Sequence, residues 1–101
     1  MELNITTQGK ETTVAFIGRL DTPASQEVSA ALAPVQEKAD GTIILDCKEL
    51  EYISSSGLRI FLTLRKAAAA KGGSVIVRNL TPEVRNVFMM TGFLNLFKIE
   101  G

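Results

Sequence analysis

The stretch Ile53-Ser54-Ser55-Ser56-Gly57-Leu58 places three consecutive hydroxyl side chains and a glycine where an extended apolar segment gives way to a helical one. The first residues of a helix carry unpaired backbone N–H groups and a partial positive charge. Such a position suits a capping hydroxyl, a bound anion or a serine that becomes phosphorylated. We therefore expect the function of the chain to lie at this junction.

Upstream of the serines, the sequence predicts a hairpin, a helix and a buried strand. Residues 3–7 and 13–20 are strand-like and flank the turn residues 8–10. A helix is predicted from Pro23 to Lys38, because apolar side chains recur along it at spacings of three and four. Residues 42–45 form a short continuous apolar run, typical of a strand buried on both faces.

Downstream, the second predicted helix runs from the serines to Lys71-Gly72-Gly73, whose glycines can close a helix. A strand is predicted over residues 74–77, and a third helix from Pro82, capped by Thr81, to about Met90. The last segment, residues 94–99, reads as a short strand or as irregular structure. Strands followed by helices imply crossover connections and a sheet that is at least partly parallel, so the fold class is α/β.

Length and composition restrict the function. The chain has 101 residues, which suits one domain over residues 1–101, and its 11 basic residues balance 11 acidic ones. A general nucleic-acid binder would carry an excess of positive charge. There is no histidine and only one cysteine, Cys47, so the chain offers no zinc site, no histidine acid or base and no internal disulfide. We expect no metal, no cofactor and no enzymatic activity.

No targeting segment is evident in the sequence. The N-terminus lacks a basic region followed by an apolar run, and no apolar stretch approaches the roughly 18 residues of a membrane span. We expect a cytoplasmic protein with no direct membrane insertion.

Two interpretations of the serines and of the following helix stay open at this stage. A single capping serine, Ser54 or Ser55, would stabilise the helix by about 1 kcal/mol and need have no other role. However, Gly57 in the first turn costs about 1 kcal/mol relative to alanine, and it allows a backbone or a partner to approach closely.

The apolar arc of the predicted helix that follows the serines is also wider than one sheet face needs. Either neighbouring helices cover Leu58 and Leu62, or these leucines belong to a docking surface.

Several motifs together resemble those of one family. Gly18-Arg19-Leu20-Asp21 resembles a Gly-Glu-Leu-Asp signature, and residues 53–58 resemble a Met-Asp-Ser-Ser-Gly-Leu signature. Further matches to the same family are Gly72-Gly73 ahead of a strand, and the run from Leu80-Thr81-Pro82 through Val87-Phe88 to Thr91-Gly92-Phe93. The chain therefore resembles the bacterial anti-anti-sigma factors of the STAS domain class over nearly its whole length.

This resemblance implies a fold, a function and partners. The fold is a single small mixed sheet with about three to four helices packed mainly on one side. The function is that of an anti-sigma factor antagonist, which binds a serine-kinase anti-sigma factor, releases a sigma factor by partner switching, and so regulates transcription. The kinase would end the interaction by phosphorylating the serine that matches Ser55, and a PP2C-type phosphatase would restore it.

The expected partner-binding residues surround this phosphoprotein site. They are Asp21, Thr22, Ser54, Ser56, Gly57, Leu58, Arg59 and Leu62. The chain departs from the signature at Ser54, which stands where the family has an aspartate. Asp21 has two possible roles: it lies near Ser55, or it is a turn residue or cap at the start of the first helix.

A second function is implied by the same family. STAS domains also occur as regulatory subunits of membrane transport systems, many of which lack a serine at the acceptor position. Because this chain has one, we favour the antagonist.

Overall fold

Five strands and four α-helices make up the chain, and the computed structural model describes all residues from 1 to 101. In order, the elements are β1 (Glu2–Gln8), β2 (Glu11–Leu20), α1 (Thr22–Ala31), α2 (Ala33–Glu37), β3 (Thr42–Ile53), α3 (Ser55–Ala70), β4 (Ser74–Arg78), α4 (Pro82–Thr91), the 3-10 turn η1 (Phe93–Asn95) and β5 (Lys98–Glu100).

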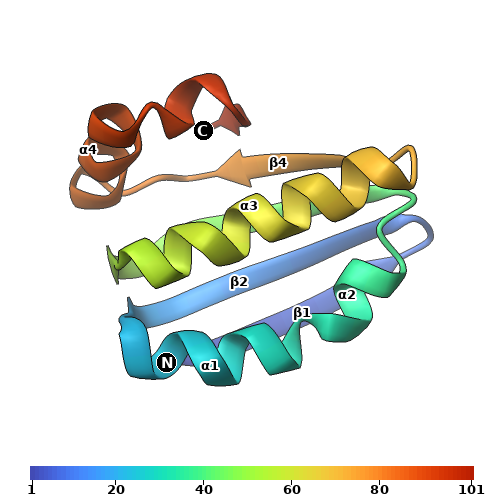
Figure 1. The fold of residues 1–101 in the computed structure, drawn as a ribbon, viewed down its shortest axis with the longest axis horizontal. Coiled ribbons are helices and arrows are strands. Elements are labelled where there is room, and N and C mark those ends of the chain that lie inside the picture. Colours follow the sequence, from blue (N-terminus) through green and yellow to red (C-terminus); the bar gives the residue numbers. More distant parts are fainter.

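The strands form one mixed sheet in the order β1-β2-β3-β4-β5. The β1–β2 pair is antiparallel, as expected for a hairpin, and the other three pairs are parallel. Figure 1 shows α1, α2 and α3 lying together in front of the strands. The predicted α/β class, with a small mixed sheet and helices mainly on one side, is confirmed.

The core lies between the sheet and the helices. Side chains that face the helices alternate along β2 with those that face away, so Val14, Phe16 and Leu20 are fully buried while Ala15 and Ile17 are only half-buried. A cluster of phenylalanines links the layers, with neighbouring ring centroids 5.1 to 6.4 Å apart. Its members are Phe16, Phe61, Phe88, Phe93 and Phe97.

The first predicted helix is divided in two. The structure breaks it at Leu32, between α1 and α2, although the sequence predicted one helix from Pro23 to Lys38. Pro34 explains the break, because its ring has no N–H and would clash with the carbonyl of Ala30 in a continuous helix. The side chains that predicted the helix, including Val28 and Val35, are nevertheless buried as expected.

The central strand is much longer than predicted. The apolar run of residues 42–45 is only the first part of β3, which continues to Ile53. The first part pairs with β2 and with β4, whereas the second part pairs with β2 alone. Several residues of the second part are therefore exposed. Among the large side chains of this part, Leu50 and Ile53 alone are buried. This mixture hides the strand from a search for continuous apolar runs.

Cys47 lies in the middle of β3 and is fully buried. Burial raises the pKa of its thiol to about 12, and the neighbouring carboxylate of Asp46 contributes to the rise. The residue therefore behaves as the small buried hydrophobe that the sequence predicted.

The remaining elements agree with the predicted ones. α3 begins within the serines and ends before Gly72, and α4 begins at Pro82 with Thr81 as its cap. The final segment forms η1 and the short strand β5, which pairs with β4. None of the helices is both long enough and apolar enough to cross a membrane.

Candidate functional site: the paired helix starts

The helices α1 and α3 begin next to each other at the carboxyl ends of β2 and β3. β2 and β3 are parallel, and their last residues, Leu20 and Ile53, are paired. The chain then enters α1 after Leu20 and α3 after Ile53. The N–H of Ser54 donates to the carbonyl of Leu20 at 2.9 Å, which holds the two starts together. The carboxyl ends of parallel strands thus bring Asp21 beside the serines.

Asp21 caps α1. Its Oδ1 atom accepts a hydrogen bond from the N–H of Ala24 at 2.9 Å, and its carbonyl accepts one from the hydroxyl of Ser25 at 2.8 Å. Of the two roles left open for Asp21, the cap is confirmed, and the strand pairing also places the residue beside Ser54. The carboxylate is half-buried and already engaged with the backbone.

The three serines have different environments. Ser54 is the cap of α3: it is 8% exposed, and its hydroxyl accepts a hydrogen bond from the N–H of Gly57 at 3.1 Å. Ser56, in the first turn, is half-buried. Ser55 is the first residue of the helix, is exposed, and makes no side-chain hydrogen bond to the protein. Its hydroxyl is therefore accessible at the positive end of a helix 16 residues long.

Gly57 is explained by packing inside the protein. A Cβ atom at this position would lie 2.8 Å from Cγ of Leu20 and 2.9 Å from Cγ1 of Ile53. The close approach that the sequence suggested is therefore that of two core side chains, rather than of another backbone or a partner. Gly57 is buried and belongs to the junction between the strand ends and the helix.

The apolar arc of α3 is covered in one place and open in another. Leu58 is only 6% exposed and belongs to the core, so little of its side chain is available to a partner. Leu62 is half-buried, and Arg59 is exposed one turn after Ser55. Part of the arc is thus buried in the core, and Leu62 and Arg59 remain accessible.

A shallow groove of about 570 Å³ runs between α1 and α3 next to Ser55. Thr22 and Ser56, both predicted from the sequence, line it at the helix starts. Arg59, the one charged member of the lining, was also predicted from the sequence. The remaining lining residues were not predicted; they are Ser25, Gln26, Ser29, Ala30, Ile60 and Thr63. Small and hydroxyl side chains recurring along α1 are the signal that could have revealed the groove.

These features define a class: a small α/β domain that presents an accessible serine at a helix start, beside a polar groove between two helices. The comparison with protein families then identifies the family. Residues 2–101 match the STAS domain, and the chain belongs to that family.

Relatives within the family carry related names. A Bordetella bronchiseptica protein, BtrV, proposed to be an anti-sigma factor antagonist, is 34% identical over 84 residues, which cover 83% of this chain and 72% of BtrV. The anti-sigma-B factor antagonist of Staphylococcus aureus is 27% identical over 102 residues, covering 99% of this chain and 94% of that protein.

Solved structures agree on the fold. The anti-sigma factor antagonist SpoIIAA in its unphosphorylated form superposes with a TM-score of 0.82 at 23% identity, covering 99% of this chain and 88% of SpoIIAA. A Bacillus SpoIIAA structure in the phosphorylated form is similar as well, with a TM-score of 0.77.

Proposed function

We propose that this protein is an anti-sigma factor antagonist whose binding to a serine-kinase anti-sigma factor is ended by phosphorylation of Ser55. The observation that carries the proposal is the accessible hydroxyl of Ser55 at the first position of α3, next to a Ser54 hydroxyl that is already used as the cap. The names of the relatives from Bordetella bronchiseptica and Staphylococcus aureus support the same role. The protein acts by binding, not by catalysis, and we place it in the cytoplasm with its partners.

The proposed binding surface is the groove between α1 and α3 together with the exposed part of α3. It comprises Thr22, Ser55, Ser56, Arg59 and Leu62, with Ser54, Gly57 and Asp21 holding the two helix starts in place. Hydroxyl groups supply hydrogen bonds, Arg59 supplies a charge, and Leu62 supplies apolar area. A partner packed here would bury the neutral hydroxyl of Ser55.

Phosphorylation would then block binding locally. A phosphoserine adds about −1.5 to −2 charge at neutral pH, and a helix start accommodates a negative charge. The fold of the antagonist should therefore survive the modification. A partner on this surface would instead have to desolvate a dianion, which is costly without a new basic counterpart. A PP2C-type phosphatase would reverse the block.

The test is direct. We expect one serine-kinase anti-sigma factor encoded by the same genome to bind the unmodified protein and, with ATP, to add a single phosphate to Ser55, as measured by intact mass and site mapping. The phosphorylated protein should lose binding while its backbone NMR shifts change only around residues 54–62. Absence of both binding and phosphate transfer with every such kinase would favour a transport-associated role. Shifts spread over the sheet and α4 would replace the local block with a global conformational change.

A further inference from the structure

A second groove lies at the opposite end of α3 from Ser55. It is about 930 Å³ in volume and is formed between the β1–β2 hairpin and α2. Lys71, which follows the last residue of α3, lines it. Because α3 has 16 residues, its two ends are separated by about 24 Å at 1.5 Å per residue. The groove is therefore separate from the proposed kinase-binding surface.

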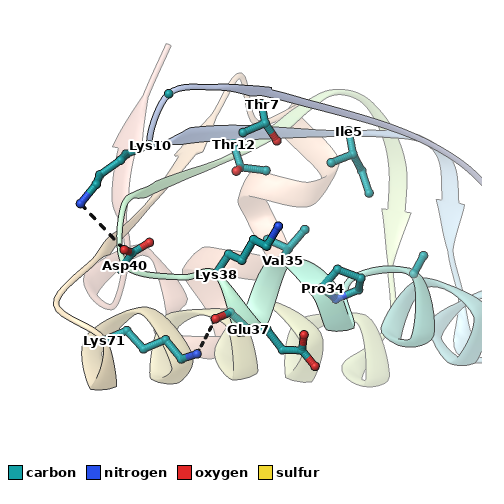
Figure 2. A pocket seen from close by; sticks show the side chains of 12 residues that line it. Ile5, Thr7, Lys10, Thr12, Pro34, Val35, Glu37, Lys38, Asp40 and Lys71 are labelled. Carbon is teal, nitrogen blue, oxygen red and sulfur yellow. Dashed lines mark hydrogen bonds and ion pairs between the residues drawn. The ribbon is translucent and has the colours of Figure 1, made fainter.

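The groove exists because α2 does not cover the end of the hairpin. Ile5 pairs with the fully buried Val14 and so faces the helix side of the sheet, yet it is 41% exposed. Thr7 and Thr12, a directly paired couple, occupy the next helix-facing positions toward the turn. Figure 2 shows these side chains directed from the hairpin toward α2, with Val35 opposite them. The space has a partly apolar floor and a hydroxyl-lined roof.

Three lysines and two carboxylate side chains surround this space. Lys10 pairs with Asp40 at 3.8 Å, and Lys71 donates to the carbonyl of Glu37. Lys38 has neither an ion pair nor a hydrogen bond to the protein. In Figure 2 its side chain extends from the end of α2 toward the hairpin, so its ammonium is a positive charge of the groove that has no partner in the protein.

We propose that this groove binds a small amphipathic monoanion, a medium-chain aliphatic carboxylate. The ammonium of Lys38 and the hydroxyls of Thr7 and Thr12 supply donors for one carboxylate. Ile5, Pro34 and Val35 supply an apolar surface for the chain. The volume falls within the roughly 300 to 1,000 Å³ of small-molecule sites.

The lining also argues against other anions. It contains no aromatic side chain on which a nucleotide base could stack. Glu37 and Asp40 at the rim oppose a ligand with several negative charges. The three lysines and two carboxylates of the lining sum to a net charge of +1, which beside an aliphatic surface matches a single carboxylate on an aliphatic chain.

The experiment is an NMR titration of the whole protein with sodium octanoate below its micellar range. We expect saturable shifts at Ile5, Thr7, Thr12, Val35 and Lys38, and none at Ser55. Lys38→Gln should weaken binding by roughly two- to fivefold, as expected for loss of one exposed charge contact. The matched control, Lys48→Gln, removes an exposed lysine outside the groove and should leave the affinity unchanged.

Two further measurements separate the contribution of the ligand's carboxylate from that of its aliphatic chain. Octanol keeps the aliphatic chain without the charge and should bind more weakly than octanoate by a factor similar to that of Lys38→Gln. Ile5→Thr keeps a β-branched residue in the strand and should weaken both ligands about threefold. Equal binding of octanol and octanoate, or no effect of Lys38→Gln in a folded variant, overturns the assignment of an anion. Shifts that do not saturate, or that lie elsewhere, overturn the site. Neither result bears on phosphorylation of Ser55.

Discussion

The helices α1 and α3, which begin side by side at the carboxyl ends of β2 and β3, have N-terminal caps of different charge. α1 begins with the carboxylate of Asp21, whereas α3 begins with the neutral hydroxyl of Ser54 and has no acidic residue in its first turn. The positive end of α1 is therefore already compensated, and that of α3 is not. A phosphate on Ser55 would supply at α3 the negative charge that α1 carries permanently. This difference suggests why the charge at the start of α3 can be changed by phosphorylation, whereas the charge at the start of α1 is permanent.

The largest effect should come from removing the proposed acceptor. Ser55→Ala should accept no phosphate from the cognate kinase while still binding it, because Ser54 keeps the cap and the surface loses only one hydroxyl. Intact mass and a binding titration measure the two results. Ser56→Ala is the matched control and should be phosphorylated as the unaltered protein is. A full phosphate on the Ser55→Ala variant, mapped to Ser54 or Ser56, would place the switch on a different residue.

Gly57→Ala tests whether the junction of the two helix starts is closely packed. The added methyl group meets Leu20 and Ile53 at under 3 Å. Overpacking of this kind costs about 1 to 3 kcal/mol, against about 1 kcal/mol gained from the helix propensity of alanine. We expect the free energy of unfolding to fall by up to about 2 kcal/mol in chemical denaturation. In a Leu20→Ala background, which removes the contacts with Leu20 and leaves the one with Ile53, the same substitution should cost less; an equal loss in both backgrounds would rule out the contact with Leu20 as the cause.

The caps themselves should differ modestly in strength. Ser54→Ala leaves the buried N–H of Gly57 without its acceptor and should lower the free energy of unfolding by about 1 to 2 kcal/mol. Asp21→Ala frees the N–H of the half-buried Ala24, which water can reach, so a loss of about 0.5 to 1 kcal/mol is expected. Added salt should reduce the Asp21 effect and leave the Ser54 effect unchanged. The reverse salt dependence would contradict the contrast between charged and neutral caps.

The smallest effect concerns the modified protein. Arg59 lies four residues after Ser55 on the same face of α3 and makes no ion pair. Phosphorylation should stabilise the domain by about 0.3 to 1 kcal/mol through the helix start. Arg59→Gln should remove about 0.3 to 0.5 kcal/mol of that gain without affecting the unmodified protein. Thermal unfolding of both forms measures it, with Lys66→Gln, which removes an exposed and unpaired charge further along the helix, as the control; a phosphate that destabilises the domain would refute the idea.

Much of the fold could be predicted from the sequence because its signals are local. The caps at Ser54 and Thr81 and the closing glycine at position 72 mark helix ends with groups that act within a few residues. The break at Leu32 was missed because the periodicity of the apolar residues continues through Pro34. The second half of β3 was missed because it is stabilised by pairing with β2 and by burial of a few side chains under α3 and α4, which are contacts with distant parts of the chain.

For the candidate site too, the residues set by local signals could be predicted from the sequence, and the features set by distant contacts could not. The serines, Asp21 and Thr22 could be found from the resemblance and from capping chemistry. The sequence could not assign Leu58 to the core, because that depends on which flanks of α3 its neighbours cover. Nor could it reveal the groove beside Ser56, because a groove is a property of two helices packed together.

Alkylation of the buried thiol of Cys47 can measure how often the centre of the sheet opens. Only a thiolate reacts quickly with alkylating reagents, and this thiol is both inaccessible and held in its protonated form while β3 is in place. Because the chain contains no other cysteine, each alkylated molecule records one event in which the centre of the sheet was exposed. Pulsed alkylation followed by mass measurement would therefore give opening rates for the phosphorylated and unphosphorylated forms in the same tube, since the two forms differ in mass.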